Sequence, residues 1–252
     1  MPDSVAGEGF IDLHCHVLHA VDDGPENLRG ALDIAAGLKA LGWTCIVATP
    51  HVRPGLFDPD DRSILASLNE LRAAVGPGGP RILLAGEHYL DADVWQRIAD
   101  GRGRAYPNGR SLLLEISTAG PAPARLAEQL FRMRVGGMRP VLAHPERCAA
   151  FQDDLEILHE LKRAGVAVAL DLTSLVGQGG RRARKTAERL LELDLVDVAC
   201  TDVHDAREMS DVEKALARLR KLCGAEVLER LLHAGPARLA LDPPPPPPEA
   251  RH

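Results

Sequence analysis

Six apolar runs along the chain each end in a side chain that can bind a metal ion. The residues at these ends are His14, His51, Glu87, Glu115, His144 and Asp202. In a parallel barrel the C-terminal ends of all strands lie on one face, where such barrels carry their active sites. The pattern therefore predicts a barrel with a metal site at that face.

The first of these runs carries two histidines. Residues 10–13 are expected to form a short buried strand, and His14 and His16 follow it. Side chains two apart on a strand project to the same face, so the two imidazoles can converge. Neutral imidazole is a good ligand for zinc, iron and related metals. Cys15 alternates with the histidines and is expected to point away from them.

Strands and helices alternate about seven times, which favours a parallel sheet closed by helices. The seventh strand spans residues 166–170 and ends at Asp171. Helices are predicted over residues 26–41, 60–75, 91–99, 122–134, 153–164, from about 181, 211–222 and 225–232. An open doubly wound sheet is the alternative, but no phosphate-binding glycine motif follows a strand. Closure would also bring His14 near His204.

Length and composition set the class of protein. The 252 residues suit one large α/β domain, expected over residues 10–241, between a flexible N-terminus (1–9) and a proline-rich disordered tail (242–252). The net charge of −6 argues against nucleic-acid binding. No apolar stretch approaches the ~20 residues of a membrane span, and the N-terminus lacks the features of a signal peptide. A soluble, cytoplasmic protein is expected.

The five cysteines do not predict a disulfide framework or a nucleophile. Their number is odd and no C-x-x-C pair occurs, which favours reduced core thiols. Cysteine-dependent tyrosine phosphatases carry an arginine six positions after the cysteine. None of the five cysteines has one there, so that mechanism is excluded.

Six segments carry a family resemblance: IDLHCHVLHAVDDGP, ATPHVRPGLF, AGEHYL, LLLEIS, VLAHPER and TDVHD. The chain resembles PHP-domain (polymerase and histidinol phosphatase) proteins. Within them it is similar to the bacterial tyrosine phosphatases of capsule and exopolysaccharide operons. The VDDGP and HPER segments favour this branch over histidinol phosphatases. The resemblance implies a distorted (β/α)7 barrel.

Nine side chains are candidate metal ligands: His14, His16, Asp23, His51, Glu87, Glu115, His144, Asp202 and His204. One metal is satisfied by about three or four protein groups, so nine imply two or three divalent ions, of manganese, iron or zinc. The resemblance implies one ion on His14, His16, Glu87 and Asp202, a second on Glu87, Glu115 and His144, and a third on Asp23, His51 and His204.

Three arginines are candidates for contact with a substrate phosphate. Arg147 leaves the same strand end as His144, and its alternative is a salt bridge to Glu146 or another rim carboxylate. If Arg147 binds phosphate, Arg147→Ala is expected to lower turnover while the melting temperature of the protein barely changes. Arg53 follows His51, with pairing to an acidic neighbour as its alternative. In the family a further arginine stands about five residues after the last D-x-H motif. In this chain Arg207 stands three residues after it and is the candidate for that role.

The loop of residues 101–110 carries further arginines. A solvated turn is favoured there over a phosphopeptide-docking loop.

We interpret the chain as a metal-dependent protein-tyrosine phosphatase that uses a metal-bound hydroxide. Its expected partner is the phosphotyrosine-containing tail of a bacterial tyrosine kinase that controls capsule or exopolysaccharide synthesis. The protein would then reach the membrane only through that partner, and an oligomer is compatible with the sequence. The alternatives are another PHP phosphoesterase, such as a histidinol-phosphate phosphatase, or a catalytically idle metal-binding interaction module.

Overall fold

The computed structural model describes residues 9–241. The predicted proline-rich tail (242–252) and all but the last residue of the predicted N-terminal segment (1–9) lie outside the described residues. The strands are β1 (Phe10–Cys15), β2 (Trp43–Ala48), β3 (His51–Val52), β4 (Arg81–Leu84), β5 (Glu87–Tyr89), β6 (Ser111–Glu115), β7 (Arg139–Ala143), β8 (Ala167–Asp171) and β9 (Val198–Cys200). They form two sheets, ordered β1-β2-β4 and β3-β5-β6-β7-β8-β9, and all paired strands run parallel.

These nine strands correspond to the seven predicted runs, because two runs are each broken in the middle. Thr49 and Pro50 separate β2 from β3, and Ala85 and Gly86 separate β4 from β5. Proline lacks the N–H that a regular ladder needs. Backbone hydrogen bonds from Ala85 N to Ala48 O (2.9 Å) and from Glu87 N to Pro50 O (3.1 Å) carry the pairing across both breaks.

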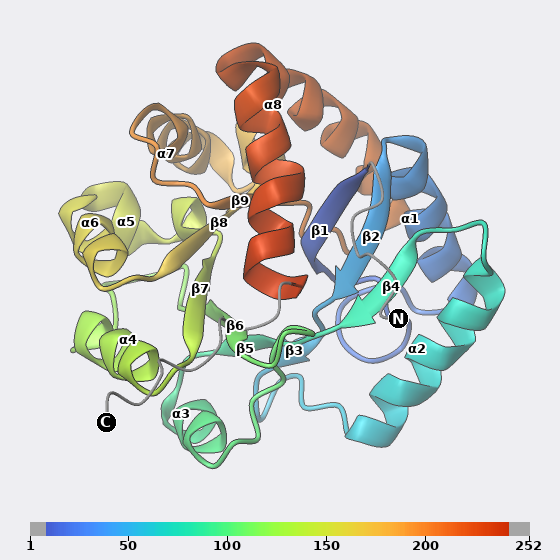
Figure 1. Ribbon diagram of the computed structural model, residues 1–252, viewed down its shortest axis with the longest axis horizontal. Coiled ribbons are helices and arrows are strands. Elements are labelled where there is room, and N and C mark those ends of the chain that lie inside the picture. Colours follow the sequence, from blue (N-terminus) through green and yellow to red (C-terminus); the bar gives the residue numbers. More distant parts are fainter. Residues whose placement is uncertain (1–8, 242–252) are drawn as a thin grey trace, which may run out of the picture.

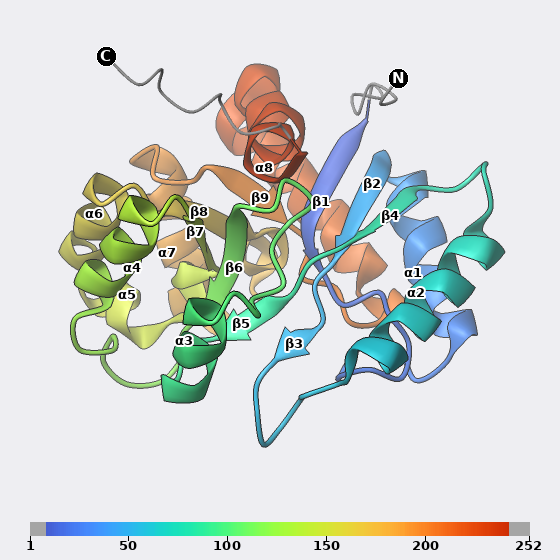
Figure 2. The ribbon, with the colours of Figure 1, turned by 60° about the horizontal axis from the view of Figure 1, so that its bottom comes forward.

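The first and last strands meet and close the barrel (Figure 2). Asp202 N donates to His14 O at 2.8 Å, and His16 N donates to Val203 O at 2.9 Å. Across the same junction, the buried Asp12 carboxylate accepts hydrogen bonds from the N–H and hydroxyl of Thr201. The predicted distorted (β/α)7 barrel is thereby confirmed, and the open doubly wound sheet is excluded.

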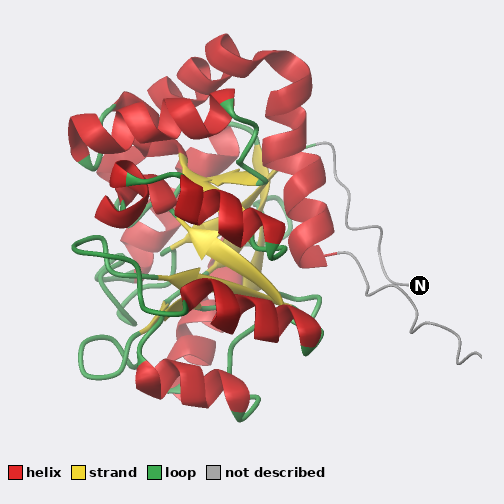
Figure 3. Cartoon of the chain, turned by 90° about the vertical axis from the view of Figure 1, so that its left-hand side faces the viewer, coloured by secondary structure: helices red, strands yellow, loops and turns green. Residues whose placement is uncertain are grey.

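The principal helices cover the outside of the strands (Figures 1 and 3). They are α1 (Leu28–Ala40), α2 (Asp61–Val75), α3 (Ala92–Ala99), α4 (Leu126–Val135), α5 (Ala149–Asp153), α6 (Glu156–Arg163), α7 (Gly180–Glu192) and α8 (Met209–Glu229). Shorter helical segments are η1 (Pro145–Arg147), η2 (Leu172–Val176), η3 (Ala206–Glu208), η4 (Arg230–Ala234) and η5 (Ala237–Leu241). No helix in the described part of the chain is long and apolar enough to cross a membrane.

Two helix boundaries depend on local chemistry. The predicted helix over 153–164 is wrong in extent, because α5 and α6 are separate and the Asp154 carboxylate accepts from Glu156 N at 2.8 Å, where α6 starts. Within α8, Gly224 has φ 77° and ψ 179°, a conformation open mainly to glycine. This kink divides α8 at the junction between the two predicted helices, 211–222 and 225–232.

Alternate side chains of the strands pack into two layers. In β6, Leu112 and Leu114 join the apolar layer between strands and helices, whereas Leu113 joins the layer on the opposite face. The inner layer is rich in small residues, such as Ala167 and Ala169 of β8, which suits the narrow interior of a barrel. The buried Tyr106 also belongs to this layer. Because alternate side chains of a strand point to opposite faces, the position of a residue in its strand decides whether its side chain points into the barrel or toward the helices.

Candidate metal centre

All nine predicted ligand side chains gather at the C-terminal ends of the barrel strands. Their ligand atoms form overlapping groups within 4.8 Å of one another: His16, Asp23, His51 and His204; His14, His144 and Asp202; His14, His16 and Glu87; His51, Glu87 and Glu115. His14 lies in β1, His51 and Glu87 are register partners at the starts of β3 and β5, and Glu115 ends β6. The side chains therefore come from around the whole barrel.

The Glu87 carboxylate lies in the middle of four imidazoles. Its Oε2 is 3.2 Å from His14 Nε2, 3.3 Å from His16 Nε2 and 3.0 Å from His51 Nδ1. Its Oε1 is 3.0 Å from His144 Nε2. A carboxylate with both oxygens directed at imidazoles could contribute to holding more than one ion.

Two aspartates complete the arrangement on either side. Asp202 Oδ1 lies 3.1 Å from His14 Nε2 and 3.5 Å from His16 Nε2. Asp23 Oδ1 lies 3.4 Å from both His51 Nε2 and His204 Nε2. The side chain of Asp23 is 46% exposed, whereas that of Asp202 is 3% exposed. The site is therefore closed at Asp202 and open to solvent at Asp23.

Backbone strain marks two of the nine positions. His144 has φ 32° and ψ 54°, and Asp202 has φ 51°, which are uncommon values for residues other than glycine. Hydrogen bonds from His144 N to Ala169 O and from Asp202 N to His14 O hold these turns, each at 2.8 Å. Strain of this kind is concentrated at functional sites, where the surrounding structure enforces it.

Sequence reasoning chose Asp23 and passed over its neighbour Asp22. Asp22 Oδ2 lies 2.8 Å from His16 Nδ1 and accepts from His51 N at 3.0 Å, and its Oδ1 accepts from Gly24 N at 3.0 Å. A carboxylate on Nδ1 orients the ring and leaves Nε2 directed into the cluster. Both aspartates are therefore used, one facing the cluster and one behind it.

Burial and neighbouring carboxylates act in opposite directions on the histidines. Burial lowers the pKa of His16, but Asp202 and Asp22 outweigh it and raise that pKa well above the usual value. At His51, burial again lowers the pKa, but the hydrogen bond to Asp23 outweighs it and the pKa rises to about 9. Such histidines hold protons until a metal ion replaces them, so ion binding releases protons.

The carboxylates show the complementary effect. Burial raises the pKa of Glu87, but the charge of His14 outweighs it and holds that pKa well below the usual value. Burial and then the nearby Glu87 charge raise the pKa of Glu115. Glu115 therefore resists ionisation beside another carboxylate, an effect that a bound cation would reverse.

The residues present fit bound metal ions. Among the described residues, Glu115 Oε2 and His144 Nδ1 are buried without a hydrogen-bond partner, and His51 Nδ1 and Glu87 Oε2 lie 3.0 Å apart without forming a well-aligned hydrogen bond. Buried polar atoms normally have partners, so a concentration of exceptions at one place calls for an explanation. Mixed imidazole and carboxylate donors suit divalent transition metals. Metal coordination would account for the unpartnered Glu115 oxygen and for the crowding of imidazole nitrogens around Glu87 Oε2.

A family model for capsular polysaccharide synthesis, CpsB/CapC, matches residues 10–240. The chain belongs to the CpsB/CapC family. The tyrosine-protein phosphatase YwqE of Bacillus subtilis (strain 168) is 28% identical over 222 residues, which cover 86% of this chain and 87% of that protein. The solved structures of YwqE and of CpsB from Streptococcus pneumoniae are those of metal-dependent tyrosine phosphatases. One chain from these structures matches with a TM-score of 0.81 at 25% identity, covering 91% of this chain and 94% of the matched chain.

The histidinol phosphate phosphatase of Lactococcus lactis has a related fold. It matches with a TM-score of 0.53 at 16% identity, over 85% of this chain and 94% of that chain. At this identity the likeness concerns the fold alone.

In this CpsB/CapC chain, Arg147 is held between two carboxylates. Its Nε and Nη2 donate to Asp171 Oδ2 at 3.0 and 2.5 Å, and its Nη1 donates to Asp202 Oδ2 at 2.7 Å. Burial lowers the pKa of Arg147, but Asp171 and Asp202 outweigh it and raise that pKa above the usual value. Arg147 therefore forms the salt bridge that was its alternative role, and its partners are Asp171 and Asp202 instead of Glu146. A grip on phosphate stays a prediction.

Arg53 and Arg207 differ in their surroundings. The Arg53 guanidinium lies 3.9 Å from the centroid of the Tyr89 ring, and within residues 9–241 no carboxylate forms an ion pair with it. Arg207 donates to both oxygens of Asp205, at 2.9 and 2.8 Å, and its side chain is 89% exposed. Asp205 caps η3 and keeps Arg207 on the outer surface, so the geometry gives its predicted role no support.

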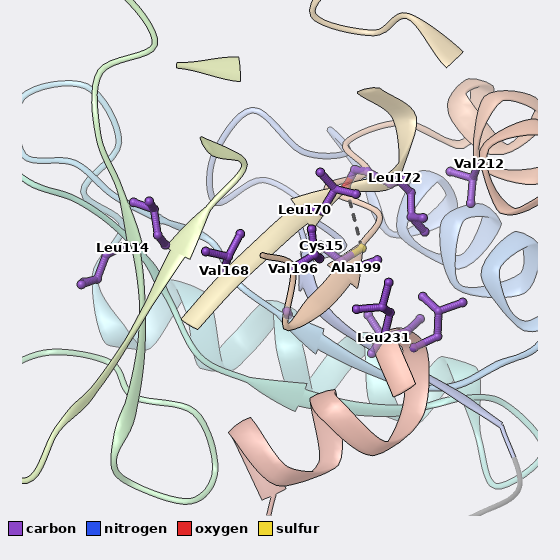
Figure 4. Packing of buried hydrophobic residues seen from close by; sticks show 14 of the residues in the cluster. Cys15, Leu114, Val168, Leu170, Leu172, Val196, Ala199, Val212 and Leu231 are labelled. Atoms are coloured by element: carbon purple, nitrogen blue, oxygen red, sulfur yellow. Dashed lines mark hydrogen bonds between the residues drawn. The ribbon is translucent and has the colours of Figure 1, made fainter. Parts of the chain in front are cut away.

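Cys15 points away from the metal centre, as predicted. It is fully buried in the layer between strands and helices, with Leu170, Val196 and Ala199 around it (Figure 4). Burial raises the pKa of its thiol well above the usual value. A protonated thiol in an apolar layer cannot act as the nucleophile.

Proposed function

We propose that this chain is a protein-tyrosine phosphatase that holds two or three divalent ions on the nine clustered side chains. The observation that carries the proposal is the convergence of these side chains in overlapping groups at the mouth of the barrel. A structural metal site is normally closed by about four ligands, whereas several shared groups with one exposed edge suit catalysis. The relatives in the CpsB/CapC family support the reaction.

The predicted ligand sets overlap the observed groups to different degrees. The third predicted set lies within one observed group, the first is spread over two, and the second adds His144 to Glu87 and Glu115, which are grouped with His51 instead. One ion would be held by His14, His16, Glu87 and Asp202, a second by Glu87, Glu115 and His144, and a third by Asp23, His51 and His204. Bound there, the ions would lower the pKa of water and neutralise phosphate oxygens. Asp22 orients His16 for this task. The exposed edge at Asp23 admits the phosphate.

Arg53 is the arginine best placed to grip the phosphate. It stands two residues after His51, and its stacking on Tyr89 leaves its charge uncompensated by a carboxylate of the described residues. Arg147 holds Asp171 through two nitrogens and Asp202 through one, so its first role is to position Asp202, and any contact with phosphate would use the N–H groups that these bonds leave over. Loss of a phenolate with a pKa near 10 requires less help than loss of an alkoxide.

The substrate we infer is the phosphotyrosine-containing tail of a bacterial tyrosine kinase that controls capsule or exopolysaccharide synthesis. The family description, capsular polysaccharide synthesis, supports this partner. The reaction would take place in the cytoplasm, and the kinase would bring the enzyme to the membrane.

Steady-state rates of the metal-loaded protein test the proposal. A phosphotyrosine peptide should be hydrolysed with a higher kcat/KM than a phosphoserine peptide or histidinol phosphate. Glu87→Gln should lower turnover at least ~10²-fold, because it removes the central bridging carboxylate. Glu156→Gln, on the exposed face of α6, is the matched control and should keep the parental rate. No turnover of phosphotyrosine by the parent would reject the proposal.

A further inference from the structure

A cavity of about 430 Å³ opens beside the metal centre and has His51 in its wall. Its charged lining comes from the segment that leads into α2 and from α3 with the loop after it. These residues are Asp58, Asp60, Asp61, Arg97, Arg102 and Arg104. The cavity thus shares His51 with the site proposed for the phosphate, and its lining carries both signs of charge.

Two of the aspartates are already engaged within the protein. Asp58 accepts from both terminal nitrogens of Arg97, at 2.7 and 2.8 Å. Asp60 caps α2 by accepting from Ser63 N at 2.7 Å. Neither carboxylate needs a ligand, and Arg97 has its partner.

Arg102 and Arg104 are each paired with an exposed carboxylate. Arg104 Nη2 lies 2.5 Å from Asp61 Oδ1, in a pair whose arginine side chain is 24% exposed and whose aspartate side chain is 81% exposed. Arg102 Nη2 lies 2.9 Å from Asp100 Oδ2, and the Arg102 side chain is 60% exposed. Exposed pairs of this kind contribute little, so both arginines can exchange their carboxylates for one from a ligand.

The backbone at Arg104 is fixed to the barrel. Arg104 N donates to His88 Nε2 at 3.0 Å, and Arg104 O accepts from Gly86 N at 3.1 Å. His88 Nδ1 in turn donates to Leu113 O at 2.9 Å. These bonds involve no atom of the Arg104 side chain, so they hold the loop in place before any ligand binds.

We propose that this cavity binds an acidic side chain next to the phosphotyrosine of the protein substrate, through Arg102 and Arg104. The inference rests on the proposed function, since the phosphate must occupy the metal centre for its neighbours to reach the cavity. An extended peptide advances about 3.3 Å per residue, so a residue one to three positions away reaches the neighbouring wall. The proposal takes the second interpretation of the 101–110 loop, phosphopeptide docking, in preference to a solvated turn.

The test uses phosphotyrosine peptides that differ only in carrying Glu, Gln or Lys within three positions of the phosphotyrosine. The metal-loaded parent should have a kcat/KM for the Glu peptide about threefold to tenfold above that for the Gln peptide. Arg104→Ala and Arg102→Ala should each bring this ratio toward one. Arg102→Glu should shift the preference toward Lys. Arg189→Ala, an exposed arginine of α7 paired with Glu192, is the matched control and should keep the parental ratio.

The outcomes separate the inference from the proposed function. Equal kcat/KM values for the Glu and Gln peptides in an active parent would overturn the inference and leave the phosphatase intact. A Glu preference that survives in both Arg102→Ala and Arg104→Ala would also overturn it. No hydrolysis of any of the peptides would overturn both.

Discussion

Replacing Arg147 with alanine should destabilise the metal-free protein, because two buried carboxylates then lose their cation. The side chains of Asp171 and Asp202 are only 1% and 3% exposed, whereas that of Arg147 is 25% exposed. Removing one partner of a buried ion pair costs about 3–5 kcal/mol, and water access to Arg147 reduces this to about 2–3 kcal/mol. Bound ions also face Asp202, so the loss should be smaller in the metal-loaded protein.

Urea unfolding of chelator-treated parent and Arg147→Ala measures this loss. Asp171→Asn provides a double-mutant cycle, and the double variant should lose less than the sum of the single losses, by about 1 kcal/mol or more. If Arg147 also grips phosphate, Arg147→Ala should lower turnover by about 10²–10³, and Arg147→Lys should recover part of it. An unchanged unfolding free energy would refute the ion-pair reasoning and restore the simpler picture of a free phosphate ligand.

Three further substitutions test separate parts of the structure. Cys15→Ser should keep phosphotyrosine hydrolysis within a fewfold of the parent, because the thiol lies in the apolar layer; abolished activity at unchanged metal content would contradict this. Asp22→Asn should weaken metal affinity about 10–100-fold in a chelator competition, and parental affinity would show that His16 needs no such support. Gly224→Ala should cost about 1–3 kcal/mol in urea unfolding through its backbone angles, and no loss would disprove that strain.

The fold was largely predictable because each strand shows the same simple pattern. An apolar run that ends in a ligand-type residue, such as the run ending at Glu115, needs no knowledge of distant contacts to be recognised. The breaks at Pro50 and Gly86 were not predicted, because the pairing between neighbouring strands compensates for them. The separation of α5 from α6 was not predicted; Asp154 is extended there and accepts from Glu156 N, and an aspartate in this sequence does not by itself signal such a break.

The metal cluster was predictable in composition but not in its supporting contacts. Strand ends bring most of the nine side chains to one face of the barrel, whereas Asp23 and His204 come from the loops after β1 and β9. The choice between Asp22 and Asp23 depends on how one turn is oriented, and neighbouring identical residues give no signal for that. The pairing of Arg147 with Asp171 joins the ends of two strands, a contact between residues 24 positions apart. Asp171 caps the following turn through Thr173 N and also accepts from Arg147.

Metal analysis of the purified protein, combined with chelation, tests the central claim most directly. We expect two or three equivalents of a transition metal per chain, because nine ligand side chains in overlapping groups exceed what one ion requires. Strong chelation should abolish hydrolysis of a phosphotyrosine peptide, and adding back manganese, zinc or iron should restore it. Full activity in protein shown by elemental analysis to contain no metal would contradict the account.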